Sequence, residues 1–169
     1  MIDRYSHPDM AAVWSDAHRL DTWLRVELAA TEAREARGEV PDGVVARVRA
    51  AAKLDLARMR QIEADVQHDV IAFLSMVAES VGDDARHLHA GMTSSDLVDT
   101  ALALQIQEAG RVLVAALARL RRAAWTLAQA HRRTPMVGRS HGVHAEPITF
   151  GLKALLWCEE LGRGLDRVQ

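Results

Sequence analysis

The sequence predicts an all-α fold, because its apolar residues recur at helical spacing and its chain-breaking residues are few. Only ten glycines and four prolines occur in 169 residues, and they cluster between the periodic segments. Residues 95–133 contain no proline and one glycine, Gly110, while apolar residues step by threes and fours. Hydrophobic residues make up 49% of the chain and charged residues 26%, which is enough apolar material for a packed core.

Residues 1–92 are expected to form an N-terminal helical domain. Residues 1–8 lack a helical period, and the first helix is predicted over residues 16–37, with Asp16 as its cap and Gly38 as its end. Four further elements are predicted: a helix opened by Pro41, a helix over residues 55–66, a helix over residues 69–81 that ends at Gly82, and a short element over residues 84–90 that leads to Gly91.

The helix predicted over residues 95–133 is too long for a small globule. It would measure about 58 Å at 1.5 Å per residue, whereas a compact chain of this length is about 40 Å across. Its apolar stripe therefore needs a cover from outside this segment, most simply the equivalent helices of other subunits. Residues 93–169 are accordingly expected to start a central bundle of long helices, and the protein is expected to be a homo-oligomer.

Residues 135–147 break the helical pattern and are expected to be irregular. They contain two histidines, His141 and His144. A last helix is predicted to begin near Thr149 and to run towards residue 169 without a convincing stop, so further helices are expected to follow.

Composition excludes several classes of function. The 21 basic and 23 acidic residues nearly cancel, and aromatic residues make up 4%, which argues against nucleic-acid binding. A single cysteine, Cys158, excludes an internal disulfide and a two-cysteine zinc ribbon. The chain shows no leader-like start and no uncharged apolar run near 18 residues, so we expect a cytoplasmic protein without a membrane partner.

Residues 93–96 (Thr-Ser-Ser-Asp) stand directly before the long helix. Their common role is a capping box, in which a hydroxyl accepts a free N–H and Asp96 favours the positive end of the helix dipole. The same N–H groups and hydroxyls can instead bind a carboxylate, and the two roles are compatible.

Three other segments carry possible site residues. A histidine such as His141 transfers protons near neutral pH, although exposed loop histidines often have no role. Metal binding by His141 and His144 is less favoured, because no carboxylate stands at His-Glu-x-x-His spacing. His68 and Asp69 begin a helix; such a pair also occurs in metal-dependent phosphohydrolases, which is a weak alternative. The Arg-Tyr pair at residues 4–5 would otherwise be a frayed end.

Together these segments resemble the adenylosuccinate lyase family, a branch of the fumarase/aspartase superfamily. The Thr-Ser-Ser-Asp and Gly-Arg-Ser-His blocks are typical of the superfamily, and the Arg-Tyr start and His-Gly-Val-His-Ala-Glu-Pro are typical of this branch. The resemblance covers essentially all 169 residues but only the N-terminal two fifths of a typical member. The segments that carry it are residues 4–6, 67–70, 89–100 and 138–147.

The resemblance implies a β-elimination that releases fumarate in purine nucleotide biosynthesis. The substrates would be adenylosuccinate, which gives AMP, and succinylated aminoimidazole carboxamide ribotide, which gives the free carboxamide. A base must remove a weakly acidic C–H proton beside a carboxylate held by donors, and an acid must protonate the departing nitrogen. The resemblance implies neither a metal nor an organic cofactor.

The resemblance also assigns roles to residues. His141 matches the general acid, and His68 matches a second histidine that assists in binding or proton transfer. Thr93 and Ser94 match substrate-binding positions. The remaining candidates are binding residues: Arg4 and Tyr5 at the nucleotide phosphate, His89 in the same pocket, and Gln67 and Asp69 beside His68.

Two departures from the family limit the prediction. Gln67 stands where arginine is expected, so one charged contact is missing or moved. The family's mobile Gly/Ser-rich loop, with its catalytic serine, is absent, and family active sites combine three subunits of a homotetramer. The chain is therefore expected to be an inactive fragment by itself.

Two alternatives to this family remain open: a sister lyase similar to argininosuccinate lyase and a non-catalytic helical oligomerisation module.

Overall fold

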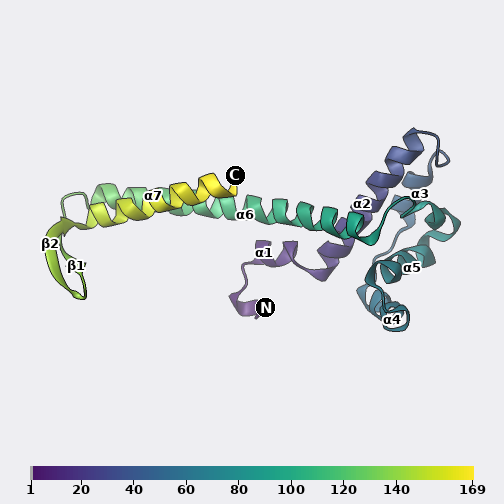
Figure 1. Ribbon diagram of the computed structural model, residues 1–169, viewed down its shortest axis with the longest axis horizontal. Coiled ribbons are helices and arrows are strands. Elements are labelled where there is room, and N and C mark those ends of the chain that lie inside the picture. Colours follow the sequence, from purple (N-terminus) through teal and green to yellow (C-terminus); the bar gives the residue numbers. More distant parts are fainter. Residues whose placement is uncertain (1) are drawn as a thin grey trace. The chain divides into compact units, whose positions relative to one another are not determined.

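Helices make up most of the computed structural model, which describes residues 2–169 (Figure 1). The predicted all-α class is confirmed, with one small hairpin of strands added. The elements are η1 (Asp3–Tyr5), α1 (Pro8–Val13), α2 (Asp16–Ala36), α3 (Val44–Ala51), α4 (Leu56–Val66), α5 (Asp69–Val81), η2 (Gly82–His87), α6 (Ser94–Ala130), β1 (Pro135–Ser140), β2 (Val143–Thr149) and α7 (Phe150–Val168).

The chain divides into two compact units, Met1–Glu108 (unit 1) and Ala109–Gln169 (unit 2). Helix α6 contributes residues to both units. The predicted domain limit between residues 92 and 93 stays a prediction.

The core of unit 1 is formed by α2, α3, α4 and α5, together with the first turns of α6. Trp23 of α2 and Phe73 of α5 meet edge to face, with 5.4 Å between their ring centroids. Leu97 and Ala101 of α6 are fully buried in the same cluster. Burial of these two side chains fixes the start of α6 against the other helices of unit 1.

Helix α2 begins with a different cap from the one predicted. Its N-cap is Ser15, whose hydroxyl accepts the backbone N–H of His18 at 3.2 Å. Asp16 is the first helical residue, and its carboxylate pairs with Arg19 and Arg60. The prediction that Asp16 is the cap was wrong, because a serine one position earlier reaches the free N–H.

Helix α3 begins at Val44 and not at Pro41, because the residues between them form a turn with Gly43 at φ +84°. Glu35, near the end of α2, accepts the backbone N–H groups of Gly43 at 2.7 Å and Val45 at 3.0 Å. These hydrogen bonds, first that of Val45, hold the pKa of Glu35 below its usual value. A carboxylate from the preceding helix therefore caps α3.

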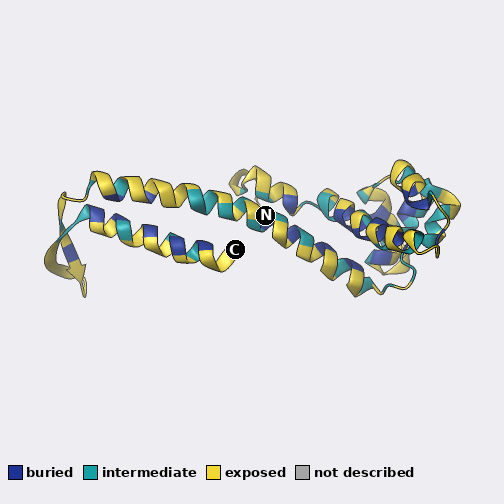
Figure 2. Ribbon diagram, turned by 90° about the horizontal axis from the view of Figure 1, so that it is seen from above, coloured by how far each residue is buried: buried dark blue, intermediate teal, exposed yellow. Residues whose placement is uncertain are grey.

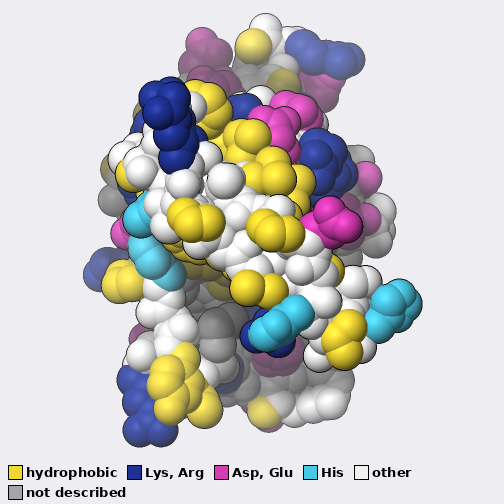
Figure 3. All heavy atoms as spheres, turned by 90° about the vertical axis from the view of Figure 1, so that its left-hand side faces the viewer, with side chains coloured by type: hydrophobic (Ala, Val, Ile, Leu, Met, Phe, Trp, Pro, Cys, Tyr) yellow, Lys and Arg dark blue, Asp and Glu magenta, His cyan; other side chains and the backbone are white. Residues whose placement is uncertain are grey.

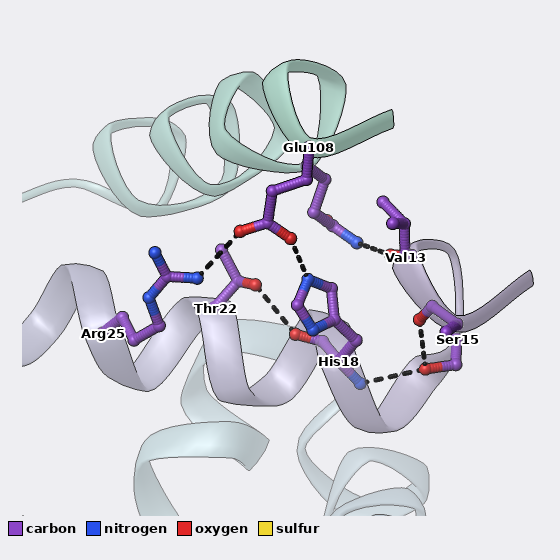
Figure 4. A network of polar contacts seen from close by, with 8 residues as sticks. Val13, Ser15, His18, Thr22, Arg25 and Glu108 are labelled. Atoms are coloured by element: carbon purple, nitrogen blue, oxygen red, sulfur yellow. Dashed lines mark hydrogen bonds and ion pairs between the residues drawn. The ribbon is translucent and has the colours of Figure 1, made fainter. Parts of the chain in front are cut away.

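A polar network joins α6 to α1 and α2 within unit 1 (Figure 4). Glu108 contacts His18 Nε2 at 2.5 Å and accepts from Arg25 Nη1 at 3.0 Å. One turn earlier the buried amide of Gln105 donates to the Val13 carbonyl at 2.8 Å. The hydrogen bond from Arg25 lowers the pKa of Glu108, burial opposes this shift, and His18 lowers the pKa further.

We predict that Glu108→Gln destabilises unit 1 at neutral pH by about 1 kcal/mol, since an amide cannot pair with both cations. A lowered pKa adds stability that is present above the ordinary value of 4.5 and is lost as the pH falls through the lower folded value. The difference between wild type and variant in urea denaturation should therefore shrink from pH 7 to pH 3. Glu32→Gln, at an exposed carboxylate 3.8 Å from Arg49, is the control and should change little. An equal loss at pH 3 and pH 7 would contradict the prediction.

Residues 135–147, expected to be irregular, belong to the antiparallel hairpin β1–β2. Ser140 pairs with Val143, so His141 and Gly142 form a two-residue turn with φ +54° and +76°. Positive φ at both positions is the requirement of a type I′ hairpin turn. The hairpin was missed because both of its faces are largely exposed and its sequence lacks the alternation of a half-buried strand.

In unit 2, α7 runs back beside the later turns of α6 (Figures 1 and 2). Small side chains lie at the contact, among them the buried Ala124, Ala128 and Ala154. At Gly151 the backbones approach so closely that an added Cβ would lie 2.5 Å from the Cα of Arg132. Close approach of this kind requires glycine at this position.

Gly151→Ala is predicted to destabilise unit 2 by about 1–3 kcal/mol, because the clash is with backbone atoms that cannot rotate away. Gly164→Ala, in the same helix, meets no atom within 4 Å. It should leave stability unchanged or raise it by up to about 1 kcal/mol through helix propensity. Urea denaturation followed by circular dichroism measures both, and equal effects of the two variants would refute the packing argument.

Unit 2 exposes large apolar side chains along α6 and α7. Figure 2 shows that many residues of both helices are exposed. Leu120, Leu156 and Trp157 are 55%, 63% and 42% exposed. A groove of about 740 Å³ between the two helices is lined by Leu120, Leu127, Trp157 and Leu161. This is the uncovered apolar surface that the long helical pattern predicts.

One helix among the described residues is long and apolar enough to cross a membrane by length and composition alone. It is α6, in which an 18-residue window has a mean hydropathy of 1.3 and is 11% buried. A single helix of this kind is weak support for a membrane location, because an apolar helix of a soluble protein passes the same test.

Candidate functional site

The predicted site residues fall on four segments: η1, the corner between α4 and α5, the loop before α6, and the turn of the β1–β2 hairpin. The first three belong to unit 1 and the hairpin to unit 2. Neither unit by itself therefore contains the whole predicted set.

At the start of α6 the cap is a carboxylate. Asp96 accepts the backbone N–H of Thr93 at 2.8 Å, which is one half of a capping box. Among residues 2–169, the hydroxyls of Thr93, Ser94 and Ser95 make no hydrogen bond, so the expected hydroxyl cap was wrong. The helix N-terminus therefore presents hydroxyls that remain available to an anionic ligand.

At the start of α6 the capping side chain and the unbonded hydroxyls belong to different residues, so stability and ligand binding can be tested separately. Asp96→Ala should destabilise the chain by about 1 kcal/mol, since it removes the cap. Ser94→Ala should stay within about 0.5 kcal/mol of wild type, since its hydroxyl has no partner to lose. Thermal denaturation of both variants tests this, and a larger loss for Ser94→Ala would mean that the hydroxyl is the cap.

His89 lies in the loop that leads into α6 and has a left-handed backbone, with φ +58°. Its backbone N–H donates to Glu27 Oε2 at 2.7 Å, and its ring Nδ1 lies 2.6 Å from Glu27 Oε1. Sequence reasoning missed Glu27. The sequence does contain a signal for this residue. Glu27 stands four residues after Trp23 on the apolar face of α2, where an acidic side chain is destabilising unless it has a partner.

The corner between α4 and α5 contains Gln67, His68 and Asp69. Gln67 ends α4 with φ +54°, and its amide donates to the Ala64 carbonyl at 2.6 Å. His68 is the N-cap of α5, and its Nδ1 accepts the Ile71 N–H at 3.4 Å. The Asp69 carboxylate lies 3.5 Å from the same Nδ1. The local roles of these side chains are helix caps, and the exposed His68 ring keeps Nε2 for other contacts.

The remaining predicted residues are exposed. His141 occupies the first position of the hairpin turn, where its ring is open to solvent, and no hydrogen bond joins it to another described residue. Figure 3 faces this end of unit 2 and shows histidine side chains on the surface. In η1 the guanidinium of Arg4 stacks on the ring of Tyr5 at 4.8 Å, and Tyr5 is 72% exposed.

A metal site finds no support in the described part of the chain. Among the side chains that the structure describes, no group of three or more histidine, cysteine, aspartate or glutamate residues is placed to hold an ion. His68 and Asp69 alone do not provide the ligand set of a metal-dependent phosphohydrolase.

Comparison with known proteins identifies the family. Residues 4–169 match the protein family described as lyase, and the chain belongs to that family. The adenylosuccinate lyase of Synechocystis sp. is 50% identical over 168 residues, and that of Bacillus subtilis is 46% identical over 167. Each alignment covers 99% of this chain and 39% of the relative, so the chain spans about two fifths of the length of these relatives.

Solved structures of the fumarase/aspartase superfamily have the same fold. The 3-carboxy-cis,cis-muconate lactonizing enzyme of Pseudomonas putida is 32% identical, with a TM-score of 0.91, over 100% of this chain and 40% of that one. A fumarate lyase of Mesorhizobium sp. is 29% identical, with a TM-score of 0.89, over 96% and 39%. The predicted superfamily fold is confirmed.

Proposed function

We propose that this chain supplies the N-terminal part of an enzyme that eliminates fumarate from adenylosuccinate and from succinylated aminoimidazole carboxamide ribotide. The observation that carries the proposal is the start of α6, where the hydroxyls of Thr93 and Ser94 are unbonded beside a capped helix N-terminus. The adenylosuccinate lyases that align with 99% of the chain support the proposed substrate class.

The chemistry of the elimination agrees with these residues. Removal of a proton beside a carboxylate builds negative charge on that group, and hydroxyls with helix N–H dipoles stabilise such charge. The departing nitrogen leaves as a neutral amine only if an acid protonates it, and we assign this role to His141. The exposed ring of His141, which has no bonded partner among the described residues, is free to exchange its proton with substrate.

The other candidates would bind the rest of the nucleotide. Arg4 carries a forked guanidinium suited to a phosphate, and the exposed Tyr5 stacks beside it. We assign His89 and His68 as further substrate contacts, with Gln67 and Asp69 beside His68. Because the Gln67 amide already bonds the Ala64 carbonyl, we expect Gln67 to contribute less than an arginine would.

We further propose that the working enzyme is a cytoplasmic homotetramer, without a metal or organic cofactor. The apolar groove between α6 and α7 supports self-association, since a large apolar surface that is exposed to water is unfavourable for a monomer. Charge supports it as well: residues 1–108 carry 19 acidic and 11 basic side chains, and residues 109–169 carry 4 and 10. Unlike units of different copies therefore attract each other.

A chimera tests the proposed activity. The aligned N-terminal part of Bacillus subtilis adenylosuccinate lyase is replaced by this chain, and fumarate release from adenylosuccinate is followed by ultraviolet absorbance. We expect turnover by the chimera and none by the 169-residue chain alone. His141→Ala should lower kcat about 10²–10⁴-fold, which is the usual contribution of a general acid.

His144→Ala, on the same hairpin, is the matched control and should keep the activity of the chimera. Circular dichroism and size-exclusion chromatography establish that each variant is folded and assembled. A folded, assembled chimera that releases no fumarate would refute the proposed function. Higher activity on argininosuccinate would favour the sister lyase, and full activity of His141→Ala would favour the non-catalytic module.

A further inference from the structure

Glu27 is the only acidic or basic residue that is buried among those whose side chains the structure describes. It lies in the middle of α2, between the core residues Val26 and Leu28, and its side chain is 0% exposed. A carboxylate in such surroundings is strongly destabilising unless hydrogen-bond donors replace the lost water. The donors that Glu27 uses therefore indicate why the chain keeps a charge at this position.

Both donors come from His89. The backbone N–H reaches Oε2 at 2.7 Å and the ring nitrogen Nδ1 lies 2.6 Å from Oε1, so each carboxylate oxygen has its own partner. One contact fixes the main chain at His89 and the other fixes the orientation of its ring. A single carboxylate bound at both points leaves the side chain little freedom to rotate.

The backbone at His89 requires such a constraint. Its φ of +58° lies in the left-handed region, which a residue with a Cβ adopts only when its surroundings impose it. Gly91 follows with φ +80°, and Thr93 then leads into α6. The position of His89 is thus connected over four residues to the hydroxyls at the helix N-terminus.

The contact also selects the protonated nitrogen of the ring. Because a carboxylate is an acceptor only, Nδ1 carries a proton when it bonds Glu27, and Nε2 is the nitrogen left for another molecule. At His68 the surroundings of Nδ1 are different, since the Ile71 N–H lies at 3.4 Å and the Asp69 carboxylate at 3.5 Å from it.

We propose that Glu27 is a positioning residue that acts through His89, orients its ring and fixes Nε2 as the nitrogen that meets substrate. The proposal rests on the proposed function for the role of His89 in substrate binding. Glu27 itself is covered by protein, so it can act on a ligand only through His89. The 18% exposed side chain of His89 is the part that reaches solvent.

The ring protonation tests the proposal without any substrate. In the 169-residue chain, two-dimensional ¹H–¹⁵N spectra of the histidine rings at pH 7–8 should show His89 with a proton on Nδ1. In Glu27→Gln the amide oxygen still accepts the backbone N–H, whereas its NH₂ group faces Nδ1 as a donor. The neutral ring should then carry its proton on Nε2. A wild-type ring that is neutral with its proton on Nε2 would overturn the proposal, even if the variant fails to fold.

Kinetics of the chimera test the consequence for binding. Glu27→Gln should raise KM for adenylosuccinate about tenfold or more and change kcat less than about threefold, as expected for a lost binding contact. Thr31→Val is the matched control, because Thr31 is buried one turn further along α2 and its hydroxyl bonds only the Glu27 carbonyl. It should lower stability and leave both the His89 spectrum and KM unchanged.

The outcomes separate the two proposals. An assembled chimera without turnover overturns the proposed function and with it the substrate role of His89, whatever the spectra show. Turnover with an unchanged KM and an unchanged His89 ring in folded Glu27→Gln overturns the positioning role alone. An equal rise of KM in Thr31→Val would mean that the effect is a general loosening of α2, which also overturns it.

Discussion

The attachment of the first turns of α6 to unit 1 is the constraint on which the candidate site depends. Leu97 and Ala101 are fully buried in the core, and further along the helix Gln105 and Glu108 bond α1 and α2. These contacts combine burial, which resists sliding of the helix, with hydrogen bonds that fix its rotation. They hold the N-terminus of α6, with Thr93 and Ser94, in a defined place.

Two acidic side chains hold the loop that precedes α6, one of them buried and one exposed. Glu27 bonds the backbone and the ring of His89, and Asp96 bonds the backbone of Thr93. Each of these carboxylates accepts a backbone N–H, which stabilises a loop that contains two residues with positive φ. Stability and the geometry of the candidate site therefore depend on the same acidic side chains.

Unit 2 differs from unit 1 in that much of its apolar surface is exposed. Its helices approach closely at small residues such as Gly151, yet their outer faces remain apolar and exposed. Unit 1 has an excess of acidic residues and unit 2 an excess of basic residues. Both the exposed apolar faces and these opposite net charges favour the self-association proposed above.

The sequence by itself determined the helical class, the length of α6, the ends of helices at Gly38 and Gly82, and the resemblance that names the site residues. These features follow from local periodicity and from glycine's access to positive φ, which act within a few residues. Only the tertiary structure decided that Glu35 caps α3, that Glu27 holds His89, that Asp96 and not a hydroxyl caps α6, and that residues 135–149 pair as strands. Most of these features depend on which groups the fold brings within hydrogen-bond distance, often from positions far apart in the chain. The hairpin is exposed on both faces, so its sequence has no hydrophobic alternation from which the strands could be predicted.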